Sequence, residues 1–192
     1  MAQHPSQELR DYERLTRSVV DAYLAAGRFP AYRAFQLAHE NDWNTISDML
    51  AKGFGATYTP TGEDRPLIRP TIMGLALLDP EHVRPICVAG DLLVQGMRAA
   101  FLSDDGDRRR WSIDELAAKA GTVRGAVQRA VPFAGELCVW ASPPDVDGKS
   151  SGQLASAVMQ CAAFTEVVAK MRERIKNARS SVPSRSREVS EQ

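Results

Sequence analysis

The sequence predicts a mainly α-helical protein that carries small β-hairpins and ends in a long helix. Apolar residues recur at steps of three and four over residues 7–26 and 153–178, which is the period of an amphipathic helix. Short β-prone runs at 56–59 and 66–69 flank a turn-rich segment, which favours a two-strand hairpin. Ser112 precedes Glu115 by three residues, the spacing of a helix capping box.

The composition is that of an ordinary globular chain. Its 192 residues are 44% hydrophobic and 25% charged, which is enough apolar material for a core. The 24 basic and 24 acidic residues cancel, so attraction to nucleic acid has to come from a local patch. The longest apolar run, near residues 72–78, is far below the roughly 20 residues of a membrane span. The first residues lack a secretory signal pattern, so we expect a cytoplasmic protein without a membrane partner.

The first 79 residues predict a run of three helices, a hairpin and one more helix. Gly27 is placed to end the first helix, and Asp42 is placed to cap the third. The elements are expected, in order, at residues 7–26, 31–40, 43–53, 56–59, 66–69 and 70–78.

A similar order recurs in residues 80–147. A helix is expected over 85–102, and a second helix opens at the capping box of Ser112 and Glu115. Gly121 then allows a tight turn into a third helix. Residues 136–140 are apolar and β-prone, which indicates a strand.

This order of helices and hairpins resembles the winged helix-turn-helix family. The strongest match is the run 111–130, in which Leu116 and Ala117 precede the glycine of the turn. After the turn, Val123, Ala126 and Val127 are expected to face inward. The resemblance implies two tandem winged helix-turn-helix units, at residues 1–79 and 80–147. In this family the third helix of a unit reads DNA, and the hairpin is the wing.

Residues 148–178 are expected to form a C-terminal amphipathic helix, and residues 179–192 a disordered tail. The apolar face of the helix needs a partner, which is either the body of the protein or the same helix of a second copy. The second arrangement predicts a homodimer. A dimer of this kind would place two reading helices about one turn of DNA apart.

Charge distinguishes the two units. Residues 108–129 hold six basic and two acidic residues, a net charge of +4, whereas residues 31–54 have a net charge of −1. Because neutralised phosphates supply much of the affinity for DNA, we expect the second unit to bind and the first, which has Asp42 and Asp48 near its third helix, to be repelled.

The predicted DNA-binding residues lie on and before the third helix of the second unit. Arg124 can pair with guanine and Gln128 with adenine, each worth about 1–3 kcal/mol of discrimination. Thr122 faces the same groove, and the residues expected to hold phosphates are Arg108, Arg109, Arg110 and Arg129. The alternative is that these arginines form a solvated helix face.

Nothing in the sequence favours catalysis. His4, His39 and His82 are separated from one another and from other metal-type ligands, which supports neither a metal site nor a histidine relay. The segment Gly148-Lys149-Ser150 lacks the earlier glycine of a phosphate loop, because position 143 is proline. We therefore expect no cofactor and no enzymatic activity. The cysteines are predicted to be reduced and packed: Cys87, Cys138 and Cys161.

The sequence thus predicts a non-catalytic regulator of transcription that binds double-stranded DNA through its second unit. The rival hypothesis is a winged-helix module that docks onto proteins. The acidic first unit favours a protein partner there, since Glu63 and Asp64 at the tip of its hairpin disfavour contact with DNA.

Overall fold

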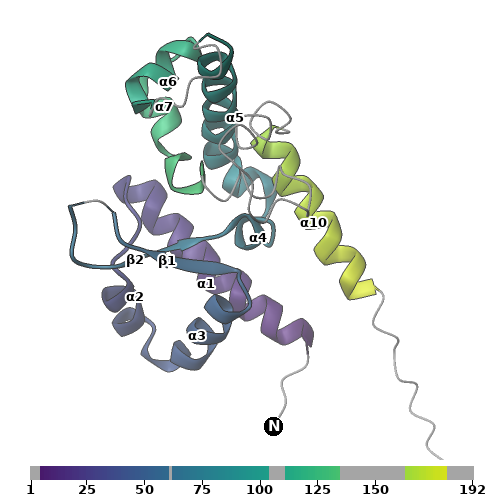
Figure 1. The fold of residues 1–192 in the computed structure, drawn as a ribbon. Coiled ribbons are helices and arrows are strands. Elements are labelled where there is room, and N and C mark those ends of the chain that lie inside the picture. Colours follow the sequence, from purple (N-terminus) through teal and green to yellow (C-terminus); the bar gives the residue numbers. More distant parts are fainter. Residues whose placement is uncertain (1–4, 61, 104–110, 135–162, 181–192) are drawn as a thin grey trace, which may run out of the picture.

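The computed structural model describes residues 5–60, 62–103, 111–134 and 163–180. The described chain is mainly helical, as predicted, with one two-stranded antiparallel sheet (Figure 1). The predicted strand at 136–140, the first part of the predicted C-terminal helix, the tail at 181–192 and residues 108–110 lie outside the described residues.

The first 79 residues form the predicted series of elements. They are α1 (Pro5–Ala26), α2 (Tyr32–Ala38), the 3-10 turn η1 (Glu40–Asp42), α3 (Trp43–Ala51), β1 (Gly55–Tyr58), β2 (Leu67–Pro70) and α4 (Ile72–Leu75). Gly27 ends α1 with a φ of 68°, a left-handed conformation that favours glycine. The prediction that the Asp42 side chain caps α3 is wrong, because its carboxylate binds Arg14 instead.

The hairpin is joined by a single β-bridge from the link between α1 and α2. In the antiparallel pair β1–β2, Gly55 lies opposite Pro70 and Tyr58 opposite Leu67. Ala31 forms an antiparallel bridge with Leu67 on the other edge of β2. The Ile68 N–H donates to the Pro30 carbonyl at 3.0 Å, so the start of α2 is tied to the sheet.

The second half contains α5 (Pro80–Ser103), α6 (Ile113–Lys119), α7 (Arg124–Gln128) and the 3-10 turn η2 (Val131–Phe133). The helix predicted over 85–102 begins five residues earlier, because Pro80 occupies the first helical position, where a missing N–H costs nothing. Pro85 is accommodated inside α5. The chain then reaches α10 (Phe164–Ser180).

The main hydrophobic core extends across residue 79, the predicted limit of the first unit. Val83 and Ile86 of α5, Phe133 of η2 and Phe164 of α10 are all part of it, together with buried residues of α1, α3 and the sheet. A smaller core joins the later part of α5 to α6 and α7. Its buried side chains are mostly small, with four alanines among seven residues, so the three helices pack closely.

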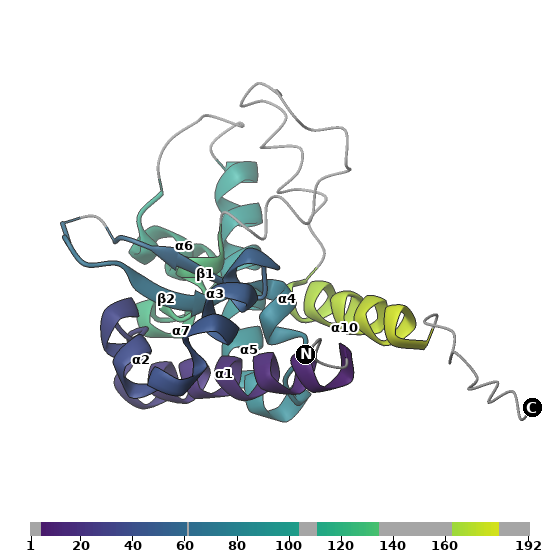
Figure 2. The same cartoon turned by 90° about the horizontal axis from the view of Figure 1, so that it is seen from below.

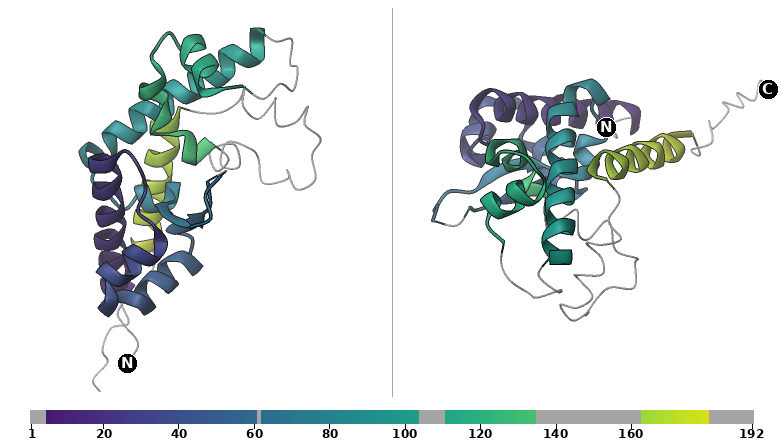
Figure 3. Two further views of the ribbon diagram at one scale, coloured as in Figure 1. Left: turned by 90° about the vertical axis from the view of Figure 1, so that its left-hand side faces the viewer. Right: turned by 90° about the horizontal axis from the view of Figure 1, so that it is seen from above.

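The two helix-turn-helix segments lie at opposite ends of the molecule. Viewed from below, α10 points away from α1 and the hairpin (Figure 2). The α6–α7 pair lies at one end of α5, far from α2 and α3 (Figure 3). The third helices of the two segments, α3 and α7, therefore cannot be treated as one continuous surface.

Candidate nucleic-acid interface at α7

Local hydrogen bonds form the α6–α7 turn as the sequence predicts. The Ser112 Oγ accepts from the Glu115 N–H at 3.2 Å, and the Ser112 N–H donates to a Glu115 carboxylate oxygen at 2.7 Å, which confirms the capping box. Gly121 has a φ of 66°, and the Thr122 N–H donates to the Ala117 carbonyl at 2.9 Å. These contacts fix the direction in which α7 leaves the turn.

The helix α7 is short, and one side of it is buried. Val127 packs into the smaller core, and so does Ala130 just after the helix. On the other side Arg124, Gly125 and Gln128 are exposed. Arg129 is exposed as well, whereas Thr122 in the turn is half-buried. The predicted residues that the structure describes therefore lie around the solvent side of one helix turn.

The described residues around α6 and α7 carry a smaller net positive charge than the +4 counted over residues 108–129. Arg124 forms an ion pair with Asp114 at 2.9 Å, and both side chains are more than half exposed. Over residues 111–134, three basic residues (Lys119, Arg124 and Arg129) face two acidic ones, a net charge of +1. Arg108, Arg109 and Arg110, which supply the rest of the net charge of +4, lie outside the described residues. An exposed ion pair contributes about 0–1 kcal/mol, so Arg124 can exchange Asp114 for a phosphate or a base.

The carboxyl end of α7 rests against the first 79 residues. The Tyr23 hydroxyl on α1 donates to the Arg129 carbonyl at 3.0 Å, and burial raises the pKa of Tyr23 to about 12. Gln128 lines an open groove of about 490 Å³, shared with Tyr58 and Glu63 of the hairpin region. Of the predicted readers, Gln128 therefore faces the hairpin, while Arg124 lies at the free end of the helix.

Phe133 anchors the second helix-turn-helix segment to the main core. Its ring is fully buried and makes edge contacts with Phe29 at 6.0 Å and Phe164 at 5.7 Å, measured between ring centroids. The Arg69 guanidinium of β2 lies over the same ring, 5.5 Å from its centroid. Because η2 follows α7 directly, this contact determines where α7 lies relative to the hairpin.

The acidic residues near α3 are engaged in hydrogen bonds and ion pairs. Asp48 accepts a hydrogen bond from the Tyr12 hydroxyl and pairs with Lys52 at 3.1 Å, and the bond from Tyr12 is the main cause of its lowered pKa. Lys52 also pairs with Glu8 of α1. Both carboxylates are bound by α1 residues or by Lys52, which lowers the negative charge that they present, and the repulsion of DNA by the first unit stays a prediction.

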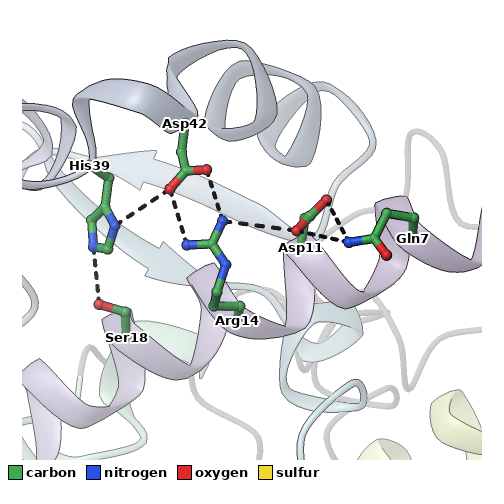
Figure 4. A network of polar contacts seen from close by, with 6 residues as sticks. All are labelled: Gln7, Asp11, Arg14, Ser18, His39 and Asp42. Carbon is green, nitrogen blue, oxygen red and sulfur yellow. Dashed lines mark hydrogen bonds and ion pairs between the residues drawn. The ribbon is translucent and has the colours of Figure 1, made fainter. Parts of the chain in front are cut away.

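A second polar cluster joins α1 to the α2–α3 link (Figure 4). The His39 Nε2 lies 3.1 Å from the Ser18 Oγ, and the His39 Nδ1 lies 3.8 Å from an Asp42 oxygen. These are the residue types of a hydrolase relay, which sequence reasoning missed because 21 residues separate Ser18 from His39.

The geometry of this cluster is that of a structural clamp. The Arg14 guanidinium donates to both Asp42 oxygens, at 2.8 and 3.0 Å, and this pairing is the main cause of the lowered pKa of Asp42. The distance of 3.8 Å from Asp42 to the imidazole is too long for the hydrogen bond that orients a catalytic histidine. The His39 ring also packs on Phe35, 4.4 Å between ring centroids. The cluster therefore holds α2 and α3 against α1.

The face of the C-terminal helix that predicted a homodimer is covered within the chain. Phe164, Val168 and Met171 of α10 are buried in the main core, where α10 packs on α4 and α5. Asp91 of α5 accepts hydrogen bonds from the Thr165 N–H at 2.9 Å and hydroxyl at 2.6 Å. Of the two open alternatives, the described part of the helix uses the body of the protein.

The remaining predictions concern thiols, metals and membranes. Cys87 is buried and free, and burial raises its pKa to about 11, whereas Cys138 and Cys161 lie outside the described residues. Among the described residues no group of three or more metal-type ligands comes together. In that same part of the chain, every helix is too short or too polar to cross a membrane.

Comparison with known proteins leaves the geometry as the basis for any functional conclusion. Neither a family model, a curated protein nor a solved structure matches this chain.

Proposed function

We propose that the protein is a non-catalytic DNA-binding regulator of transcription, built from two tandem winged helix-turn-helix units, whose α7 contacts double-stranded DNA. One observation carries the proposal: α7 presents Arg124, Gln128 and Arg129 on the exposed side of a tightly turned helix pair. Phosphate contacts from the arginines and base contacts from Arg124 and Gln128 are the chemistry this surface offers.

The first 79 residues support the winged-helix assignment. Three helices are followed by the hairpin β1–β2, and Ala31 between α1 and α2 adds a bridge to the outer edge of β2. Tying the helix link to the hairpin makes the helices and the wing one packed unit. The assignment of the second unit rests on α5, α6 and α7, since its wing is expected at 136–140, outside the described residues.

A measurement of duplex binding tests the proposal. In a fluorescence-anisotropy titration with a random-sequence duplex, we expect binding that weakens as salt rises from about 50 to about 200 mM, because bound phosphates release counterions. The double variant Arg124→Ala, Arg129→Ala removes two of the contacts. Its slope of log affinity against log salt should be smaller by about two.

A charge-matched control separates contact from net charge. Arg84 at the start of α5 pairs with Glu81, as Arg124 pairs with Asp114, and Arg174 of α10 is exposed. The double variant Arg84→Ala, Arg174→Ala has the same net charge and should bind like the wild type. Equal losses in both double variants, or no binding at about 10 µM protein in low salt, would contradict the proposal.

Protein docking is the second candidate function, and a specific observation favours it at the first unit. Leu37 is 59% exposed and Trp43 is 44% exposed, so two large apolar side chains face solvent where α2 meets α3. Exposed tryptophans are enriched at protein interfaces. Docking at α2–α3 and DNA binding at α7 are compatible, because the two surfaces lie at opposite ends of the molecule (Figure 3).

A further inference from the structure

The exposed side of α2 has an apolar centre that no described part of the chain covers. Leu37 projects from the last turn of the helix with 59% of its surface exposed, and Ala34 and Ala38 beside it are exposed too. The indole N–H of Trp43 donates to the Gln36 carbonyl at 2.9 Å. This bond satisfies the polar atom of Trp43 and ties the indole to the residue before Leu37, so the exposed part of Trp43 adds apolar surface at the end of α2.

Two opposite charges flank this centre along the chain. Arg33 lies one helical turn before Leu37, and Glu40 lies in η1, three residues after it. Both are exposed, and within the described part of the chain neither forms an ion pair. Their neighbours do: Asp42 is bound by Arg14, and Asp48 by Lys52. A cation and an anion therefore remain unmatched on either side of one apolar patch.

This order of charges is complementary to itself. When two copies of α2 pack antiparallel around a two-fold axis near Leu37, each Arg33 faces the Glu40 of the other copy, and the apolar centres meet. A two-fold contact makes every pair twice, so the arrangement satisfies four charges at once. Duplex DNA fits the surface less well, because its charge is balanced and its centre is apolar.

We propose that the α2 patch, defined as Arg33, Leu37, Glu40 and Trp43, binds the same patch of a second copy of this chain in an antiparallel, two-fold arrangement. It takes the dimerising role expected of the C-terminal helix, because in the described part of that helix, α10, the apolar face packs on α4 and α5. Because α7 lies at the far end of each copy, the two α7 helices then lie at the outer ends of the dimer (Figure 3). Half-sites one turn of DNA apart are not expected for such a dimer.

Sedimentation equilibrium of the full chain without DNA tests the inference, and its outcome does not depend on DNA binding. The patch is small, so we expect a dimer with a dissociation constant of about 10–100 µM. Leu37→Glu should make the protein monomeric at these concentrations. Leu102→Glu is the matched control, because Leu102 is 66% exposed at the end of α5, and this variant should dimerise like the wild type.

Charge reversal tests the antiparallel arrangement. Arg33→Glu alone and Glu40→Arg alone each place like charges opposite one another twice, and we expect dimerisation about tenfold weaker in each. The double variant Arg33→Glu, Glu40→Arg restores opposite charges and should recover the wild-type constant. Circular dichroism verifies that each variant is folded. A wild-type chain that is monomeric at about 200 µM, a dimer unaffected by Leu37→Glu, or a double variant as weak as the single ones would overturn the proposal.

Discussion

Replacing Gly96 by alanine tests whether α6 is held against α5 by a close approach of backbones. A Cβ at this position would lie 2.3 Å from the Leu116 carbonyl oxygen and 3.0 Å from its carbonyl carbon. The clashing atom belongs to the backbone of α6, so no side-chain rotation relieves it. The helix has to move by about 1 Å to restore an ordinary contact.

The expected loss follows from two opposing effects. Overpacking a close contact costs about 1–3 kcal/mol. Alanine in a helix interior recovers about 1 kcal/mol relative to glycine. These two values leave a net loss of about 0–2 kcal/mol in the free energy of unfolding. We expect a loss near the upper end, about 2 kcal/mol, because the core between α5 and α6 is built of small side chains such as Ala89 and Ala117, which cannot repack.

Urea unfolding followed by circular dichroism measures this loss. Gly125→Ala in α7 is the matched control, because a Cβ there meets no heavy atom within 4 Å. Only the gain in helix propensity applies to this variant, so it should be as stable as the wild type or more stable by up to about 1 kcal/mol. A Gly96→Ala protein as stable as the wild type would refute the close packing of α6 on α5.

Two further predictions concern the cap of α6 and alkaline pH. Ser112→Ala removes the bond from the Glu115 N–H to the Ser112 Oγ and should lower the free energy of unfolding by about 1 kcal/mol, measured by urea unfolding, whereas an unchanged midpoint would contradict the role of the cap. Burial raises the pKa of Tyr23 from 10.0 to about 12 and that of Cys87 from 9.0 to about 11, so the unfolded chain releases these protons first and stability should fall as pH rises from about 9 to about 12. The Tyr23→Phe variant should lose less stability than the wild type between pH 10 and about 12, and equal losses would show that the Tyr23 hydroxyl does not contribute.

Elements that depend on local chemistry could be predicted from the sequence. The helix over 7–26, its end at Gly27 and the capping box of Ser112 and Glu115 all lie where the residues predict them, because each involves groups within four residues of one another. The predicted start of α5 at Pro85 is five residues too late. Both Pro80 and Pro85 are compatible with the first helical position, and the local pattern does not distinguish between them.

The candidate site could be predicted only in part. The buried side of α7 was predicted correctly at Val127. The prediction that Val123 faces inward is wrong, because it precedes the first turn of α7 as the N-cap residue and is 72% exposed. The pairing of Arg124 with Asp114, ten residues away, reduced the charge of that surface and was not visible in a count of residues. The binding of Asp48 by Tyr12, 36 residues away, was likewise not visible in a count of residues.

The amino-acid order by itself determined the mainly helical class, the succession of helices and hairpin, and the side of each helix that is apolar, because periodicity, caps and turns act over a few residues. Only the tertiary structure decided which partner each side meets. It paired Asp42 with Arg14 of α1 and Asp48 with Tyr12 of α1, placed the apolar face of α10 on α4 and α5, and left Leu37 and Trp43 exposed. These outcomes depend on side chains brought together from distant parts of the chain, since packing selects among the partners that the local pattern allows.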